Sequence, residues 1–291
     1  MNDTLFALPV IDRLSPSLTR RLIGEVPVLV VDHPRVRGAV SLQGGQLLTW
    51  QPTGGAPGLW LGERNAWTAG TAIRGGVPLC WPWFGTVAKP SHGFARVLDW
   101  DLVSHETTEA GVVLVLRLEA SDVTRALWPH EFTLTTRISL GATCAIDIEA
   151  TGEHQSTAAL HTYLAVGSLG GATVSGLGGH YRDNLLAVDV HDAGGEVTPT
   201  GHIERVYTAP EAVSVVRDED LGRVVRLAHR EASDVVVWNP GAELAAGMAD
   251  LTDEDHLRFV CVETGRVNTA LESAPGRPAR LGVTLSVLPE A

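Results

Sequence analysis

Short runs of alternating apolar and polar residues dominate this 291-residue chain and constrain its fold most strongly. An alternation with a period of two is typical of a β-strand that buries one face. The runs are rich in β-branched residues, and turn-forming Gly and Pro residues separate them. The pattern predicts strands over residues 113–119, 133–140, 144–150, 213–216, 224–227, 235–238, 259–263 and 281–288.

Helical periodicity is scarce by comparison. Only residues 241–249 and 252–257 are expected to form short helical turns, the second with Thr252 as its cap. Many short strands without long intervening helices favour an all-β sandwich of antiparallel sheets. No stretch reads as a domain linker, so residues 1–291 are expected to form a single domain. Residues 1–17 are expected to be a loose N-terminal arm, and residues 272–280 a surface loop.

The charge balance restricts the partners of the chain. Its formal net charge of −12 repels nucleic acid and anionic membranes, so neither is an expected partner. No apolar run approaches the roughly 20 residues that span a bilayer, and the N-terminus lacks the features of a secretory signal. Three widely spaced cysteines without a CxxC pair argue against a disulfide framework and a zinc site. We therefore expect a cytoplasmic protein without a bound metal.

Residues 72–96 concentrate the chemistry of the chain. Arg74, His92 and Arg96 stand there among glycines and prolines, which allow close approach of a ligand and stiffen the backbone. Arginine forks suit phosphate oxygens, and an acidic protein needs such a local basic cluster to capture an anion. The segment therefore predicts a site for a sugar phosphate. Three aromatic side chains are expected to face the apolar side of the sugar: Trp81, Trp83 and Phe84.

Further motifs follow this segment in a fixed order, at residues 159–164, 174–183, 204–207, 237–240, 248–250 and 259–265. The ordered set resembles the D-hexose-6-phosphate mutarotases, or glucose-6-phosphate 1-epimerases, of the aldose-1-epimerase superfamily. The resemblance runs through most of the chain. It implies a large antiparallel β-supersandwich of the galactose mutarotase-like type, with few short helices.

The resemblance also implies a reaction, the interconversion of the α and β anomers of glucose 6-phosphate and related sugar phosphates. Opening the sugar ring needs a base that takes the proton of the C1 hydroxyl and an acid that protonates the ring oxygen. Each transfer is general acid–base catalysis, typically worth about 10²–10⁴ in rate. Such a reaction requires no cofactor. The implied partner is a small-molecule sugar phosphate, and the expected assembly is a monomer or weak homodimer.

Two residues match the family positions for this acid–base pair. Taken alone, a histidine on a strand such as His161 is more often a core residue bonded to backbone. Glu263, which ends an apolar strand, would by position alone be equally compatible with solvent exposure. The Leu-His-Thr-Tyr and Val-Cys-Val-Glu contexts of the family assign His161 as the acid and Glu263 as the base.

The resemblance gives Arg74 and Arg96 the role of phosphate contacts. His92 either touches the sugar or supports the acid, or else bonds to nearby backbone. Ser91 and Glu204 depart from the family pattern, which has glutamine and aspartate there. Serine is too short to replace a glutamine contact directly. Glu204 is expected either to hold a sugar hydroxyl or orient Arg74, or to face solvent from a loop.

Three other functions are also compatible with the sequence. An aldose 1-epimerase for a neutral sugar would keep His161 and Glu263 without needing two arginines. A non-catalytic carbohydrate-binding module would not need the acid–base pair. A glycosidase would need two carboxyl groups, for which Glu204 is the second candidate. Trp238 is expected either to form part of the pocket wall or, as is more common for a tryptophan that ends a strand, to lie in the core. Asp250 is expected in a solvated acidic loop.

Overall fold

The computed structural model describes residues 2–290, which form three antiparallel sheets. The first contains five strands in sequence order: β1 (Asp12–Ser15), β2 (Leu18–Ile23), β3 (Val26–His33), β4 (Val36–Ser41) and β5 (Gln46–Pro52). The second contains nine strands in the spatial order β16 (Glu196–Val197), β13 (Ala172–Ser175), β18 (Val213–Asp218), β19 (Arg223–Arg230), β22 (Ala279–Pro289), β10 (Cys144–Gly152), β9 (Phe132–Leu140), β8 (Gly111–Glu119) and β7 (Asp101–Thr108).

The third sheet carries the functional face of the molecule. Its strands follow the order β15 (Val188–Val190), β14 (Tyr181–Asp183), β17 (Ile203–Tyr207), β20 (Asp234–Asn239), β21 (Phe259–Ser273), β11 (His154–Leu160) and β6 (Leu79–Cys80), with β12 (Tyr163–Ala165) also paired to β21.

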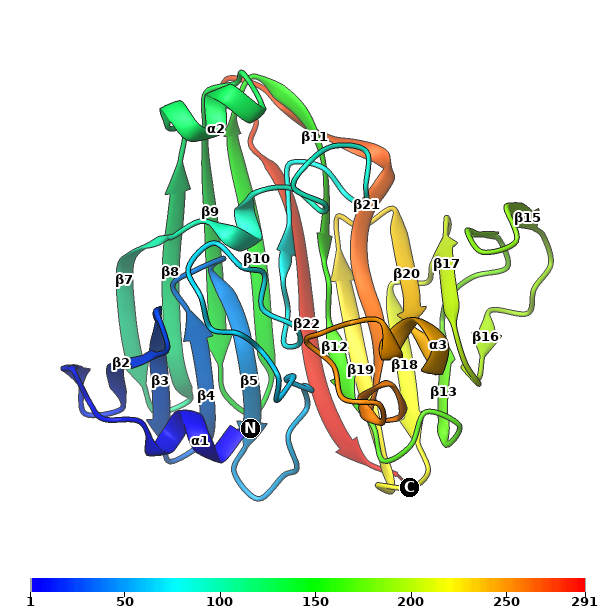
Figure 1. The fold of residues 1–291 in the computed structure, drawn as a ribbon, viewed down its shortest axis with the longest axis horizontal. Coiled ribbons are helices and arrows are strands. Elements are labelled where there is room, and N and C mark those ends of the chain that lie inside the picture. Colours follow the sequence, from blue (N-terminus) through cyan, green and yellow to red (C-terminus); the bar gives the residue numbers. More distant parts are fainter. Residues whose placement is uncertain (1, 291) are drawn as a thin grey trace.

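The nine-stranded sheet forms one layer, and the other two sheets lie side by side against it (Figure 1). One continuous apolar core joins all three sheets, with Trp50 from the first, Leu114 and Ile138 from the second, and Val237 and Val262 from the third. The all-β supersandwich expected from the sequence is therefore confirmed.

All eight of the strands expected from alternation are present, but none of them lies in the first sheet, all five strands of which the sequence pattern missed. The reason is visible in β3, where Leu29 and Val31 enter the main core while Val28 and Val30 enter a second core on the opposite face. A strand buried on both faces has a continuous apolar run, which shows no period of two. The expected loop over residues 272–280 is also shorter, because β21 continues to Ser273 and β22 begins at Ala279.

The expectation of a loose N-terminal arm is wrong for residues 2–15. Helix α1 (Asn2–Ala7) places Leu5, fully buried, in the second core, and β1 pairs with β2. Nη1 of Arg21 donates hydrogen bonds to the carbonyls of Phe6 and Leu8. Leu5, with Phe6 and Leu8 packed against the same core, and Arg21 thus hold this segment in place.

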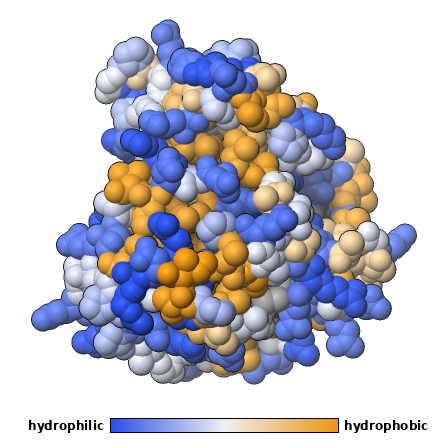
Figure 2. Space-filling view, turned by 60° about the vertical axis from the view of Figure 1, so that its left-hand side comes forward, coloured by the Kyte–Doolittle hydropathy of each residue, from blue (hydrophilic) through white to orange (hydrophobic). Residues whose placement is uncertain are grey.

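The helices are short and lie at the edges of the sheets. The expected turns occur as α3 (Gly241–Ala246) and the 3₁₀ turn η2 (Asp255–Leu257), although Thr252 does not cap the second. Helix α2 (Asp122–Leu127), which the sequence analysis missed, begins with a capping box between Ser121 and Thr124. No helix within residues 2–290 is long and apolar enough to cross a membrane. Figure 2 shows a largely hydrophilic rim around a central hydrophobic area on one face.

Candidate active site

A cavity of about 330 Å³ lies on the outer face of the third sheet, opposite the core. Alternation along β20 places it there, because Val235 and Val237 point into the core while Val236 and Trp238 line the cavity. Of the two places expected for Trp238, the pocket wall and the core, the structure shows the wall. Six of the seven residues expected from the sequence line the cavity: Arg74, His92, Arg96, His161, Glu204 and Glu263.

His161 and Glu263 meet because of strand register. Pairing of β11 and β12 with β21 sets Leu160 opposite Thr264 and Tyr163 opposite Cys261, so His161 lies across from Glu263. Nε2 of His161 is 3.4 Å from Oε1 of Glu263, and only 1% of the Glu263 side chain is exposed. The alternative of a solvent-exposed carboxylate at the end of a strand is therefore wrong for Glu263.

Packing fixes the orientation of the histidine ring. The ring stacks on Tyr163 with centroids 4.9 Å apart and planes at 10°, and it meets the Trp238 ring edge to face with centroids 5.9 Å apart. Nδ1 of His161 and Oε2 of Glu263 are buried and have no hydrogen-bond partner among residues 2–290. Buried polar atoms are seldom left unpaired, so these two atoms are free to bond a ligand.

Burial also biases the protonation of the pair. It lowers the pKa of His161 well below the ordinary value, and the charges facing the ring, including those of Arg96 and Arg74, lower it further. Burial raises the pKa of Glu263 well above the ordinary value, the negative charge of Glu204 adds to this rise, and Arg96 opposes it. Both shifts favour the uncharged form of each group, which is protonated Glu263 with neutral His161.

His92 belongs to the same aromatic cluster as His161. Its ring meets Phe84 and His161 edge to face, at centroid distances of 4.9 and 5.7 Å. Its backbone has a φ of 62°, a strained value for a residue other than glycine. Burial, followed by the charges of Arg96 and Arg74, lowers the pKa of His92 to about 3. His92 is therefore a neutral polar group at the cavity wall.

Hydrogen bonds fix both the backbone and the side chain of Arg74. Asn65 accepts a hydrogen bond from its backbone N–H at 2.7 Å and donates one to its carbonyl at 2.9 Å. Its Nε donates to Oδ2 of Asp250 at 2.9 Å, and its Nη1 donates to the Tyr163 hydroxyl at 3.0 Å. Two positions further along the chain, Gly76 has a φ of 62°, and a Cβ there would lie 2.1 Å from the backbone oxygen of Leu47.

The expectation that Asp250 lies in a solvated loop is wrong. Met248 and Leu251, on either side of it, pack with Tyr163 and Phe259 in a small apolar cluster. This packing folds the segment over the sheet and brings the Asp250 carboxylate to Arg74. Asp250, rather than Glu204, therefore orients Arg74.

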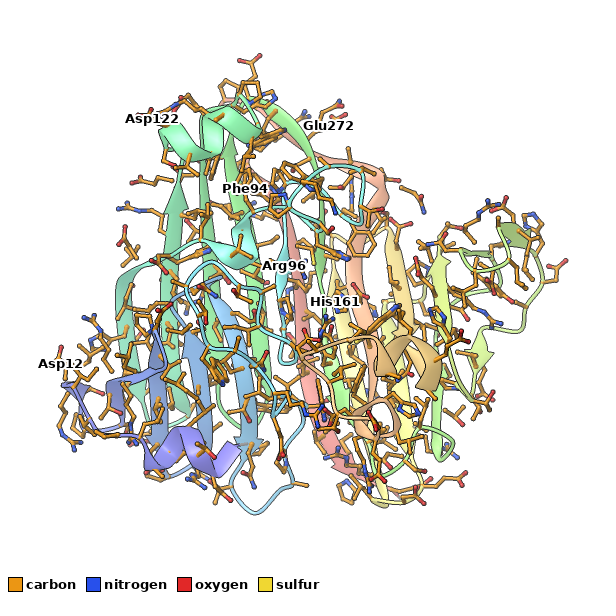
Figure 3. The ribbon with its side chains drawn as sticks, viewed as in Figure 1. Asp12, Phe94, Arg96, Asp122, His161 and Glu272 are labelled. Atoms are coloured by element: carbon orange, nitrogen blue, oxygen red, sulfur yellow. The ribbon has the colours of Figure 1, made fainter. Side chains whose placement is uncertain are left out.

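Arg96 approaches the cavity from the short 3₁₀ turn η1 (Ala95–Val97). Its Nη2 donates to the Ser91 carbonyl at 2.7 Å, and its Nε is buried without a partner. Within residues 2–290 it forms no ion pair. The Ser91 side chain lies outside the cavity lining, with Oγ 3.4 Å from Nζ of Lys89. Figure 3 shows Arg96 and His161 together near the middle of the molecule.

Glu204 faces the cavity with a partner that the sequence analysis missed. Nδ2 of Asn184 donates a hydrogen bond to Oε1 of Glu204 at 2.9 Å, and both residues line the cavity. Asp183 accepts hydrogen bonds from the N–H groups of Leu185 and Leu186 and so caps the turn that follows it. That turn positions Asn184, whose role no motif in the sequence indicates.

The aromatic residues of the loop divide differently from the expectation. Trp81 and Trp83 are buried in the main core, where both pack against Phe94, and only Phe84 lines the cavity. Gly93 makes this packing possible, because it has a φ of 76° and a Cβ there would lie 2.0 Å from the Trp81 carbonyl oxygen. The tryptophans therefore support the site without reaching a ligand.

A larger groove lies on the outer face of the nine-stranded sheet, where Arg230 pairs with Asp147 and Arg280 pairs with Glu149. No cluster of three or more His, Cys, Asp or Glu side chains within the described residues is arranged to hold a metal ion. The cavity with the unpaired His161 and Glu263 atoms is the best candidate for chemistry.

Comparisons with known proteins agree with this geometry. The sequence matches the aldose 1-epimerase family over residues 27–286. The chain belongs to the aldose 1-epimerase family. This membership makes it an isomerase and removes the basis for the binding-module and glycosidase alternatives.

The similarity to individual relatives covers nearly the whole chain. Proteins of Salmonella typhimurium and Escherichia coli, each with the proposed name glucose-6-phosphate 1-epimerase, are 43% identical to it over 99% of both chains. The crystal structure of a proposed mutarotase from Salmonella typhimurium superposes with a TM-score of 0.97 at 42% identity, covering 99% of both chains. The aldose 1-epimerase fold of this chain is thus shared along its entire length.

Proposed function

We propose that this protein is a hexose-6-phosphate 1-epimerase, which interconverts the α and β anomers of glucose 6-phosphate and related sugar phosphates. The observation that carries this proposal is one cavity that holds both a buried His–Glu pair and two arginines. The pair supplies acid–base chemistry, and the arginines supply donors and positive charge for a phosphate ester. The names of the two 43%-identical relatives support the same substrate.

In the proposed reaction Glu263 takes the proton of the C1 hydroxyl while His161 gives a proton to the ring oxygen. The C1–O5 bond breaks, and its electron pair goes to O5 as C1 becomes an aldehyde. Rotation about C1–C2 then presents the other face of the aldehyde, and the two proton transfers run in reverse. The pair carries one proton throughout, so no external acid or base is consumed.

Burial stabilises the neutral form of the pair, protonated Glu263 with neutral His161, which is the form that ring opening produces. The ring-closed sugar needs the ionic form. A hydrogen bond from the C1 hydroxyl to Glu263 favours the ionised carboxylate. His161 keeps its orientation through the ring stacked on Tyr163. The other polar groups of the wall, His92 and the Glu204–Asn184 pair, are proposed to bind sugar hydroxyls.

A neutral aldose 1-epimerase is the second candidate, and one observation favours it. The ion pair with Asp250 neutralises Arg74, so a single uncompensated arginine remains for an anion. Under either candidate we expect a monomer or weak homodimer. The phosphorylated substrate would place the enzyme in the cytoplasm.

Two-dimensional exchange NMR tests the proposal, with glucose 6-phosphate and glucose measured side by side against enzyme-free controls. We expect enzyme-dependent cross-peaks between the α and β H1 signals, with the larger kcat/KM for glucose 6-phosphate. A larger kcat/KM for glucose would favour the neutral candidate. Absence of enzyme-dependent exchange for both sugars would contradict the proposed reaction.

We also expect the activity to survive removal of metal ions. The acid–base pair needs no Lewis acid for either proton transfer, and the site residues do not have metal-ligand spacing. Dialysis against EDTA should leave the exchange rate unchanged. Loss of activity that one divalent ion restores specifically would require a different mechanism.

A further inference from the structure

The two arginines of the cavity differ in how their charge is balanced. Arg74 lies 2.9 Å from the Asp250 carboxylate, whereas Arg96 forms no ion pair within residues 2–290. From the sequence both arginines were expected to act alike on a phosphate. The structure shows two different electrostatic environments within one site.

Arg74 is largely neutralised before any ligand arrives. At 2.9 Å the charges of Arg74 and Asp250 cancel much of each other's field at the distance of a substrate group. A second guanidinium nitrogen bonds the Tyr163 hydroxyl, and Tyr163 in turn stacks on His161. Three of its five N–H donors remain, held in a fixed orientation close to the acid–base pair, and they suit an uncharged oxygen of the sugar.

Arg96 keeps its charge and most of its donors. Its guanidinium gives one hydrogen bond to a neutral carbonyl, that of Ser91, at 2.7 Å. A phosphate ester carries a charge of about −1.5 to −2 at neutral pH, and a chain with a net charge of −12 offers it few other partners. The Asp250 carboxylate would repel the phosphate from the Arg74 side, and Arg96 would attract it.

We propose that the two arginines bind different parts of the substrate: Arg96 binds the phosphate, Arg74 binds uncharged oxygen atoms of the sugar, and Asp250 maintains this division of roles. Asp250 is then a positioning residue that sets how strongly the site prefers phosphorylated over free hexose. This inference rests on the proposed function and deepens it. It assigns the ligand class of each arginine, and it gives a role to an acidic residue that would otherwise oppose anion binding.

The test compares the preference ratio, kcat/KM for glucose 6-phosphate divided by kcat/KM for glucose, in three variants. Loss of a charge-assisted contact corresponds to roughly a 10- to 100-fold change in binding. Arg96→Gln should lower the ratio by about that factor, because mainly the phosphorylated sugar loses a partner. Arg74→Gln should lower kcat/KM for both sugars together, leaving the ratio within about threefold of wild type. Arg125→Gln removes an exposed, ion-paired arginine outside the cavity and is the matched charge control.

Asp250→Asn should change the preference ratio in the opposite direction to Arg96→Gln, and it therefore tests the positioning role of Asp250. It exposes the full charge of Arg74 while loosening its orientation, so kcat/KM for glucose should fall and the preference ratio should rise. Asp253→Asn removes the same charge from an exposed position of the same loop and should leave the ratio unchanged. Asp250→Glu retains the charge and should restore the ratio toward wild type. Thermal unfolding confirms that each variant is folded.

Three outcomes distinguish between failure of the proposed function, of the different roles of the two arginines, and of the role of Asp250. If wild-type enzyme does not exchange the anomers of glucose 6-phosphate, the proposed function fails and the inference falls with it. If wild type is active but Arg74→Gln lowers the ratio as much as Arg96→Gln, only the division between the arginines is overturned. An unchanged or lower ratio in folded Asp250→Asn overturns the role of Asp250.

Discussion

The two walls of the cavity are built in different ways. Strands form the sheet wall, which presents Glu204, Trp238 and Glu263 from β17, β20 and β21. Residues 72–96 form the loop wall with Arg74, His92 and Arg96, joined by Met248 of the segment after α3. Register fixes the first, whereas side-chain bonds to backbone and positive φ values fix the second. The difference suggests that chemistry sits on the sheet wall and recognition on the loop wall.

The largest expected effect comes from the acid–base pair. His161→Asn and Glu263→Gln should each lower kcat by about 10²–10⁴, the range for one proton-transfer group. Both changes nearly preserve side-chain volume, so the variants should fold. Steady-state exchange rates on glucose 6-phosphate and on glucose should fall by similar factors. A variant with near wild-type kcat would remove that residue from the mechanism.

A smaller effect is expected from the neighbouring carboxylate. The charge of Glu204 raises the pKa of Glu263, so Glu204→Gln should lower it. If Glu263 acts as the ionised base, the acidic limb of the kcat/KM profile should then move to lower pH. Asn184→Ala loosens Glu204 without removing its charge and should move that limb less. A limb that stays in place in Glu204→Gln would show that another group controls it.

Sequence patterns anticipated the sheet wall better than the loop wall. Alternation predicted the strand that carries Glu263, and His161 lies at the break between β11 and β12, which both pair with that strand. Only the correct register is then needed to bring the two side chains together. Asp250 and Asn184 were missed because their positions depend on tertiary contacts, the packing of Leu251 in one case and the turn capped by Asp183 in the other. Trp81 and Trp83 were misplaced for the same reason, since composition does not tell whether an aromatic ring enters the core or lines a cavity.

Ionic strength should affect substrate capture by the loop wall, and the expected effect is smaller than those above. Salt screens an exposed or half-buried charge such as that of Arg96, so a rise from low to physiological salt should raise KM for glucose 6-phosphate severalfold. KM for glucose should change little, because this substrate carries no charge. Equal salt effects on both sugars would argue against electrostatic capture by the loop wall. Arg125→Gln again serves as the control for a general change in protein charge.

The smallest expected effect is on stability. The folded-state pKa of Glu263 is raised above its unfolded value, so its contribution to stability is complete below the unfolded pKa and is lost as pH rises through the folded pKa. At neutral and alkaline pH, the wild-type protein should therefore have a lower free energy of unfolding than the Glu263→Gln variant. Calorimetry should show Glu263→Gln unfolding at or slightly above the wild-type temperature, with a gap that widens as pH rises. A gap that narrows with rising pH would contradict the burial of this group as an acid.

One measurement tests the division between the walls most directly: anomer exchange by NMR on glucose 6-phosphate and glucose for wild type, His161→Asn and Arg96→Gln under identical conditions. The account predicts that His161→Asn lowers kcat/KM for both sugars by the same factor. It predicts that Arg96→Gln lowers kcat/KM mainly for glucose 6-phosphate. A change of substrate preference in His161→Asn, or an equal loss on both sugars in Arg96→Gln, would contradict the separation of chemistry from recognition.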